Sequence, residues 1–199
     1  MERSAILLVC ISIILTSFTL GCIEDNGNKD EPMQEFQISF QENRLEAFNI
    51  TRYTNDSEVT EIIKNYTQFN ITKINVYLKW NDDCKFYADC LGNVNYTNDA
   101  LDRFNLTIID PDQHVIGDES IYEIIFVNIT VNDIPKNQTV KAISEKEVVD
   151  QFVTNNGTGN WNINISCIEA RGGQMARDRG NDWILVMVVY HYEGTISRN

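Results

Sequence analysis

The chain has little of the chemistry from which most catalytic sites are built. Among 199 residues there are two histidines, His114 and His191, and neither has a partner at metal-ligand or catalytic spacing. The G-x-S-x-G, H-E-x-x-H, phosphate-loop and dinucleotide-binding patterns are absent. Carboxylates are numerous, but no pair is singled out for hydrolysis. The sequence therefore predicts a protein that is not an enzyme.

Positive charge is also scarce. The chain has 16 Lys and Arg against 29 Asp and Glu, which gives a formal net charge of −13. No run of basic residues interrupts this balance, so the surface should repel nucleic acid and anionic lipid headgroups. Nucleic acid is therefore excluded as a partner, and a solvated acidic exterior is the simplest interpretation of the charge.

No apolar run is long enough to predict a membrane-spanning helix. The longest, residues 5–20, contains four Ser or Thr, whereas a span needs about 20 predominantly apolar residues. Arg3 before the run and a small residue after it have the layout of an export signal. The ending TLGC, residues 19–22, resembles the lipobox of prokaryotic surface lipoproteins, although its leucine stands two residues before the cysteine rather than three. The resemblance implies lipidation of Cys22; an uncleaved signal anchor or an unmodified secreted cysteine are the alternatives.

The segment after the cysteine is acidic and almost without apolar side chains. Residues 22–35 cannot bury enough apolar surface to fold, so they predict a flexible tether. The predicted organisation is a signal peptide over residues 1–21, this tether, and one domain over residues 36–199. The first partner of such a chain is the membrane itself, reached through the lipid anchor.

Sequons for N-linked glycosylation are more frequent than chance, which would place roughly three in this composition. The predicted glycosylation sites are Asn49, Asn55, Asn65, Asn70, Asn95, Asn105, Asn128, Asn137, Asn156 and Asn164. The excess is typical of an exported protein with a sugar coat. Together with the lipobox, it resembles archaeal cell-surface proteins, many of which are N-glycosylated.

Three cysteines remain in the predicted domain. Cys84 and Cys90 flank a short polar loop and are predicted to form a local disulfide in an oxidising setting. Cys167 shares one face of a predicted strand with Trp161 and is expected to be a buried thiol. A three-cysteine metal site is the alternative, but it lacks a histidine at ligand spacing.

Alternation of apolar and polar side chains dominates the domain and predicts β-strands. It covers residues 36–40, 74–80, 104–108, 125–131 and 161–165, with weaker candidates at 45–52 and 60–69. The nearly continuous apolar run 183–192 predicts a central strand buried on both faces. Ser144 and Glu147 form a capping box that predicts one short helix near 145–154. About seven or eight strands and one helix predict an all-β, jelly-roll-like sandwich.

The sequons also predict which surfaces are open. Residues i and i+2 of a strand share a face, so sequons in strands present both their residues to solvent. We expect this outward placement in or beside strands at Asn49, Asn70, Asn105, Asn128 and Asn164. Loops 82–92 and 170–182 carry no sequon but hold aromatic residues and Arg171, Arg177 and Arg179, which are types enriched in contact surfaces. They are the predicted partner-binding surface; the alternative is a pair of solvated loops without a partner.

Three motifs occur in the order found in a known domain type. They are LKWNDDC at 78–84, DRFNLTIIDPDQ at 102–113 and GTGNWNINI at 157–165. They resemble the jelly-roll sandwiches appended to secreted subtilisin-like proteases, namely the prepeptidase C-terminal and convertase P types. Gln113 replaces the turn glycine of that pattern, and the CKFYADC loop is inserted. The resemblance implies an accessory, stabilising or binding module.

Carboxylates at strand ends are candidate calcium ligands, because Ca²⁺ takes about six to eight oxygen ligands. The resemblance brings Asp82, Asp83, Asp110 and Asp112 to one rim of the sandwich, and Asp178 and Asp182 form a second candidate. The alternative is that these aspartates only satisfy turn hydrogen bonds.

Together these features predict a non-catalytic binding or structural module of the cell envelope. The lipid anchor would hold it on the extracellular face of the cell membrane, where it would meet an envelope polymer or a surface protein. A solute- or substrate-capturing lipoprotein that serves a transporter or a secreted hydrolase is the alternative. That role usually needs two lobes around a cleft, and a single β domain offers little room for one.

Overall fold

The computed structural model describes residues 32–55, 57–81, 102–169 and 180–198. The chain divides into Met1–Met33 and a compact unit, Gln34–Asn199. The described strands are β1 (Gln34–Asn55), β2 (Val59–Tyr66), β3 (Ile71–Trp80), β4 (Arg103–Ile109), β5 (Val115–Ser120), β6 (Ile124–Thr130), β7 (Gln138–Ala142), β8 (Gly159–Glu169) and β9 (Gly180–Arg198). One helix, α3 (Glu145–Asp150), lies between β7 and β8. No helix within these ranges is long and apolar enough to cross a membrane.

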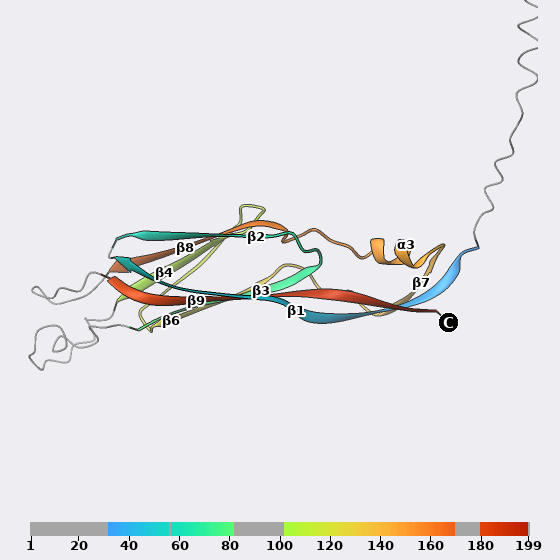
Figure 1. Cartoon of the computed structure of the whole chain (residues 1–199), viewed down its shortest axis with the longest axis horizontal. Coiled ribbons are helices and arrows are strands. Elements are labelled where there is room, and N and C mark those ends of the chain that lie inside the picture. Colours follow the sequence, from blue (N-terminus) through green and yellow to red (C-terminus); the bar gives the residue numbers. More distant parts are fainter. Residues whose placement is uncertain (1–31, 56, 82–101, 170–179, 199) are drawn as a thin grey trace, which may run out of the picture. The chain divides into compact units, whose positions relative to one another are not determined.

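The strands form two antiparallel sheets, which confirms the predicted β-sandwich. The two sheets lie as two layers (Figure 1). One sheet has the order β6-β3-β9-β1-β7 and the other β2-β8-β4-β5. Among the described strands, only β4–β5 and β6–β7 follow one another within a sheet. Every other connection crosses to the opposite layer.

The core lies between the sheets and is built by the alternation seen in the sequence. Inward side chains of β3, β4, β8 and β9 are fully buried, and Trp80, Trp161 and Trp183 are the largest among them. Burying an aliphatic or aromatic side chain stabilises a fold by about 1.5–3 kcal/mol, so this cluster dominates the stability. Cys167 lies in the cluster as a buried thiol, as predicted.

Strand β1 is one continuous strand where the sequence predicts two, at residues 36–40 and 45–52. It pairs with β9 along its length, from Phe36 opposite Arg198 to Asn55 opposite Gly180. A bulge between Arg44 and Glu46 absorbs one residue, and this break in alternation hides the continuity.

Strand β9 is central, as predicted. The prediction that both of its faces are buried is wrong. Leu185 and Met187 are buried on the inner side, whereas Ile184 is 43% exposed on the outer side. Within the described residues, no second layer of strands or helices covers that outer side.

A second, smaller core lies at the end of the unit where β1 starts. Phe36, Ile38, Ala142 and Val148 pack together there, on β1, β7 and α3. The predicted cap is confirmed: Ser144 Oγ accepts a hydrogen bond from Glu147 N at 3.3 Å, and the Glu147 carboxylate accepts one from Ile143 N at 2.8 Å.

Candidate functional site

Two regions hold residues that the sequence singled out. The first, here called the loop end, comprises the strand ends that flank residues 82–101 and 170–179: Trp80, Asp102, Gly180 and Asn181. The second, here called the acidic turn, is residues 110–114 between β4 and β5.

Buried polar contacts hold the loop end together. Asn181 Nδ2 donates to Asp102 Oδ2 at 3.1 Å, and both side chains are buried. Trp183 Nε1 donates to Thr54 Oγ1 at 2.8 Å. Buried polar groups are costly unless paired, so these contacts tie β1, β4 and β9 to one another at this end.

Gly180 sets the close approach of β9 and β1 at the loop end. Its φ is +144°, and a Cβ at this position would lie 2.1 Å from the Thr54 carbonyl oxygen. Glycine is therefore required where the chain enters β9. The loop end is a rigid base for the segments that leave it.

The loop end lies far from the point where the chain enters the unit. The chain enters at Gln34, and β1 runs from there along the length of the unit (Figure 1). Asn55, at the other end of this 22-residue strand, pairs with Gly180. At about 3.3 Å per residue, β1 separates the two points by about 70 Å. Entry and loop end therefore stand at opposite ends of the unit.

Several residues predicted from sequence lie outside the described ranges. They are Cys22, Asp82, Asp83, Cys84, Cys90, Asn95, Arg171, Arg177, Asp178 and Arg179. The exposed Asp182 is described; it lies on β9 opposite Tyr53.

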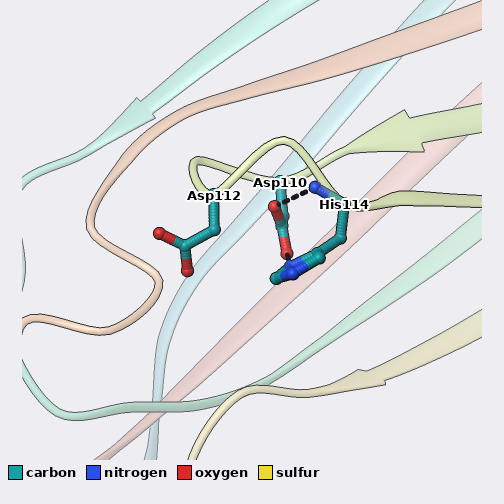
Figure 2. Close-up of side chains that lie close together, drawn as sticks. All are labelled: Asp110, Asp112 and His114. Atoms are coloured by element: carbon teal, nitrogen blue, oxygen red, sulfur yellow. Dashed lines mark hydrogen bonds and ion pairs between the residues drawn. The ribbon is translucent and has the colours of Figure 1, made fainter.

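The acidic turn is closed by one aspartate. The Asp110 carboxylate accepts a hydrogen bond from His114 N at 2.8 Å, and its second oxygen lies 2.8 Å from His114 Nδ1 (Figure 2). Gln113 N donates to the Asp110 carbonyl at 3.0 Å. Gln113 adopts a φ of +69°, which lies in the left-handed region that favours glycine.

The pair shifts the titration of both partners. Partial burial works against the charged Asp110, but hydrogen bonds from the His114 backbone and ring outweigh it and hold the pKa of Asp110 below its ordinary value. The side-chain hydrogen bond to Asp110, followed by its charge, raises the pKa of the exposed His114. Both shifts favour the ion pair.

Asp110, Asp112 and His114 also place three potential ligand atoms within 4.8 Å of one another. Calcium prefers oxygen ligands alone, whereas an imidazole with carboxylates suits transition metals. Both carboxylate oxygens of Asp110 already contact His114. Hydrogen bonds within the turn account for this arrangement without an ion.

The predicted gathering of Asp82 and Asp83 with Asp110 and Asp112 on one rim stays a prediction, because Asp82 and Asp83 lie outside the described residues. Trp80, the last residue of β3, packs against Phe104 at the start of β4, with ring centroids 4.9 Å apart. The end of β3 therefore lies against the start of β4, whereas Asp110 and Asp112 follow the other end of β4.

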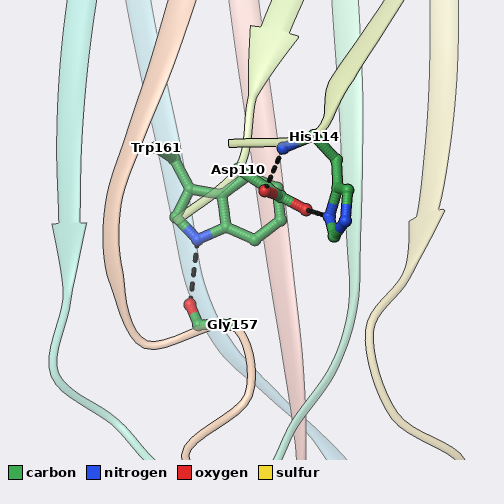
Figure 3. A network of polar contacts seen from close by, with 4 residues as sticks. All are labelled: Asp110, His114, Gly157 and Trp161. Atoms are coloured by element: carbon green, nitrogen blue, oxygen red, sulfur yellow. Dashed lines mark hydrogen bonds and ion pairs between the residues drawn. The ribbon is translucent and has the colours of Figure 1, made fainter. Parts of the chain in front are cut away.

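A pocket of about 290 Å³ opens beside the acidic turn. Its wall includes Asn156, Gly157 and Trp161, which the sequence did not connect with Asp110. Trp161 Nε1 donates to the Gly157 carbonyl at 2.9 Å and so fixes the indole (Figure 3). The shared order of the D-P-D and G-x-W motifs is the signal that links these residues.

The described sequons in strands mostly face outward, as predicted. Asn49 and Asn128 are exposed on the five-stranded sheet, together with their acceptors Thr51 and Thr130. Asn105 and Asn164 are half-buried on the outer side of the four-stranded sheet. Four further sequon asparagines are described, and all are exposed or half-buried: Asn55, Asn65, Asn137 and Asn156.

The outward prediction is wrong for Asn70. This residue has a φ of +62°, and its Oδ1 accepts a hydrogen bond from Thr154 N at 2.9 Å. Its acceptor Thr72 is 2% exposed and donates to Glu42 at 2.6 Å. The turn into β3 therefore directs this sequon into the fold.

No family model matches the sequence, and no curated protein matches it. Among solved structures, the chain is similar to a serine protease of Aeromonas sobria, with 8% identity and a TM-score of 0.33. The match covers 76% of this chain and 27% of that chain, so this chain spans about a quarter of the protease. At this TM-score the likeness carries no conclusion about function.

Proposed function

We propose that this chain is a membrane-anchored surface lipoprotein whose β-sandwich is a non-catalytic binding or structural module of the cell envelope. One observation carries the proposal: the tether would join the sandwich at Gln34, about 70 Å from the loop end at Asn55 and Gly180. A lipid on Cys22 would hold the first end at the membrane. The second end would then be free to meet a partner.

The loop end is the proposed contact surface. Residues 82–92 and 170–182 beside it carry no sequon, whereas both sheets carry sequons on their outer sides; the sequons nearest in the chain to this end are Asn55 and Asn95. Sugars exclude a macromolecule from the surface around them, so the proposed contact surface is limited to residues 82–92 and 170–182. The buried contacts of Asp102 and Thr54 supply the rigid base that a recognition surface needs.

The arginines indicate the chemistry of the partner. Arg171, Arg177 and Arg179 lie within nine residues of a strongly acidic chain. Guanidinium groups bind carboxylates and phosphates through paired hydrogen bonds. The partner is therefore an envelope polymer or surface protein that presents acidic groups.

Family membership is part of the same proposal. The three motifs that resemble the prepeptidase C-terminal and P-type sandwiches fall at the end of β3, on β4 with its turn, and on β8. Trp80 and Trp161 of these motifs are buried in the core, and Gln113 holds the conformation of the turn glycine. These placements support an accessory role of the kind those domains have.

The contact surface is tested by a triple substitution, Arg171→Ala, Arg177→Ala and Arg179→Ala. We expect it to abolish retention of the protein on immobilised envelope material at low salt, with thermal stability nearly unchanged. The matched control replaces Lys136, Lys141 and Lys146, three exposed cations at the far end of the unit, by alanine. Equal retention of both triple variants would place the contact surface elsewhere.

A further inference from the structure

The outer side of the five-stranded sheet exposes several large apolar side chains, and no strand or helix of the described residues covers it. This side, here called the outer face, exposes Ile124 by 51%, Phe126 by 49% and Ile184 by 43%. Tyr77 and Phe126 stack there with ring centroids 4.5 Å apart and an interplanar angle of 25°. Lys79 stands between Ile124 and Ile184 in the strand register, and apolar side chains surround it. An exposed apolar patch of this kind marks a surface that contacts another group.

Two sequons stand on the same face, at its two sides. The strand register makes one row across the sheet from Asn49 through Val186 and Tyr77 to Phe126. The next row runs from Asn128 through Asn75 and Val188 to Ala47. Directly opposed residues in a sheet point to the same side, so both asparagines flank the apolar centre. Three strand spacings separate β1 from β6, or about 14 Å.

Both sequons are also accessible for modification. Asn49 and Asn128 are exposed, and so are their acceptors Thr51 and Thr130. The pyranose rings of a glycan have an apolar side formed by C–H groups, which packs on aromatic and aliphatic side chains. Sugars attached at these two points reach the stacked rings from both sides, and their hydroxyl groups remain in water.

We propose that N-linked glycans on Asn49 and Asn128 fold over the outer face and cover its apolar centre. The sugars take the place of the second protein layer that such a face would otherwise require. They also keep this face from pairing with another copy of the chain. The inference rests on the proposed function, because only an exported chain meets the glycosylation machinery.

The test uses the full chain with its signal, purified from the membranes of an N-glycosylating host. Thr51→Ala and Thr130→Ala remove both acceptors while keeping the asparagines. The matched control, Thr67→Ala and Thr139→Ala, removes the acceptors of two exposed sequons elsewhere. Glycopeptide mass spectrometry reports occupancy, binding of a hydrophobic dye reports the apolar face, and light scattering reports self-association.

We expect sugar on Asn49 and Asn128, and a several-fold rise in dye binding with self-association only when these two glycans are removed. Adding Phe126→Ser to that variant should reverse the rise, because the dye would lose its site. Equal dye binding by the two double variants would overturn the inference. So would bare Asn49 and Asn128 in a chain glycosylated elsewhere, and that result would leave the surface location intact. A chain without any glycan and without a lipid on Cys22 would overturn the proposed function as well.

Discussion

At the scale of single residues, the best-defined feature is the ion pair between Asp110 and His114. The raised pKa of His114 means that its contribution to stability is complete below the ordinary value of 6.5 and is lost as pH rises through the folded-state value. The lowered pKa of Asp110 means that its contribution is present above the ordinary value of 3.8 and is lost as pH falls through the folded-state value. The pair therefore stabilises the turn between those two folded-state values.

Asp110→Asn should lower the pKa of His114 toward its ordinary value, because both the hydrogen-bonded carboxylate and its charge are removed. Asp112→Asn is the matched control and should lower it less, since Asp112 acts on His114 through charge alone. NMR titration of the His114 ring measures both effects. A larger change from Asp112→Asn would contradict the geometry of the turn.

At the scale of the element, alternation along each strand decides which side chains carry stability. Neighbours on β9 illustrate this, because Leu185 is fully buried and Ile184 is nearly half exposed. A run of apolar letters in the sequence hid the difference. The strand is one-sided because its outer side has no protein layer over it in the described part of the chain.

Leu185→Ala should lower the free energy of unfolding by about 2–5 kcal/mol, because it leaves a cavity in the main core. Ile184→Ala on the same strand should cost about 1 kcal/mol or less, mostly as lost strand propensity. Urea unfolding of the two variants under identical conditions gives the comparison. Similar costs would mean that both faces of β9 are buried, as the sequence alone predicted.

Strands with strict alternation could be predicted from the sequence, since one buried face imposes a period of two. The strands β5 and β7 could not, because they are short and mostly exposed and carry little apolar signal. Helix α3 is shorter than the predicted 145–154 segment. Val149 is 41% exposed and Val153 is 44% exposed. The Phe152 ring packs against the Phe40 ring, with their centroids 5.0 Å apart.

The candidate site was predictable only in part, for a related reason. The D-P-D turn follows from local chemistry, but its closure by His114 depends on the left-handed Gln113. The bond between Asp102 and Asn181 joins residues 79 positions apart, and no local pattern encodes it. The grouping of strand ends at the loop end likewise depends on the order of strands in two sheets.

At the scale of the whole molecule, the proposed membrane anchor and the loop end stand at opposite ends of β1. In the proposed function the N-terminal segment anchors the chain to the membrane, and the pairing of β1 with β9 carries the chain away from its point of entry. A net charge of −13 repels anionic headgroups, which fits the proposal of a unit that its tether holds away from the bilayer. Each sheet carries sequons, so the proposed contact surface is limited to residues 82–92 and 170–182 beside the loop end, which carry none.

The central claim is that Cys22 becomes a lipidated N-terminus, and mass spectrometry of the N-terminal peptide from the membrane fraction tests it most directly. The account predicts a mature chain that begins at Cys22 with fatty-acyl groups attached. It also predicts that Cys22→Ser releases the protein from the membrane or leaves it with its signal uncleaved. A membrane-bound chain that begins at Met1, or one that is cleaved normally and stays bound after Cys22→Ser, would contradict it.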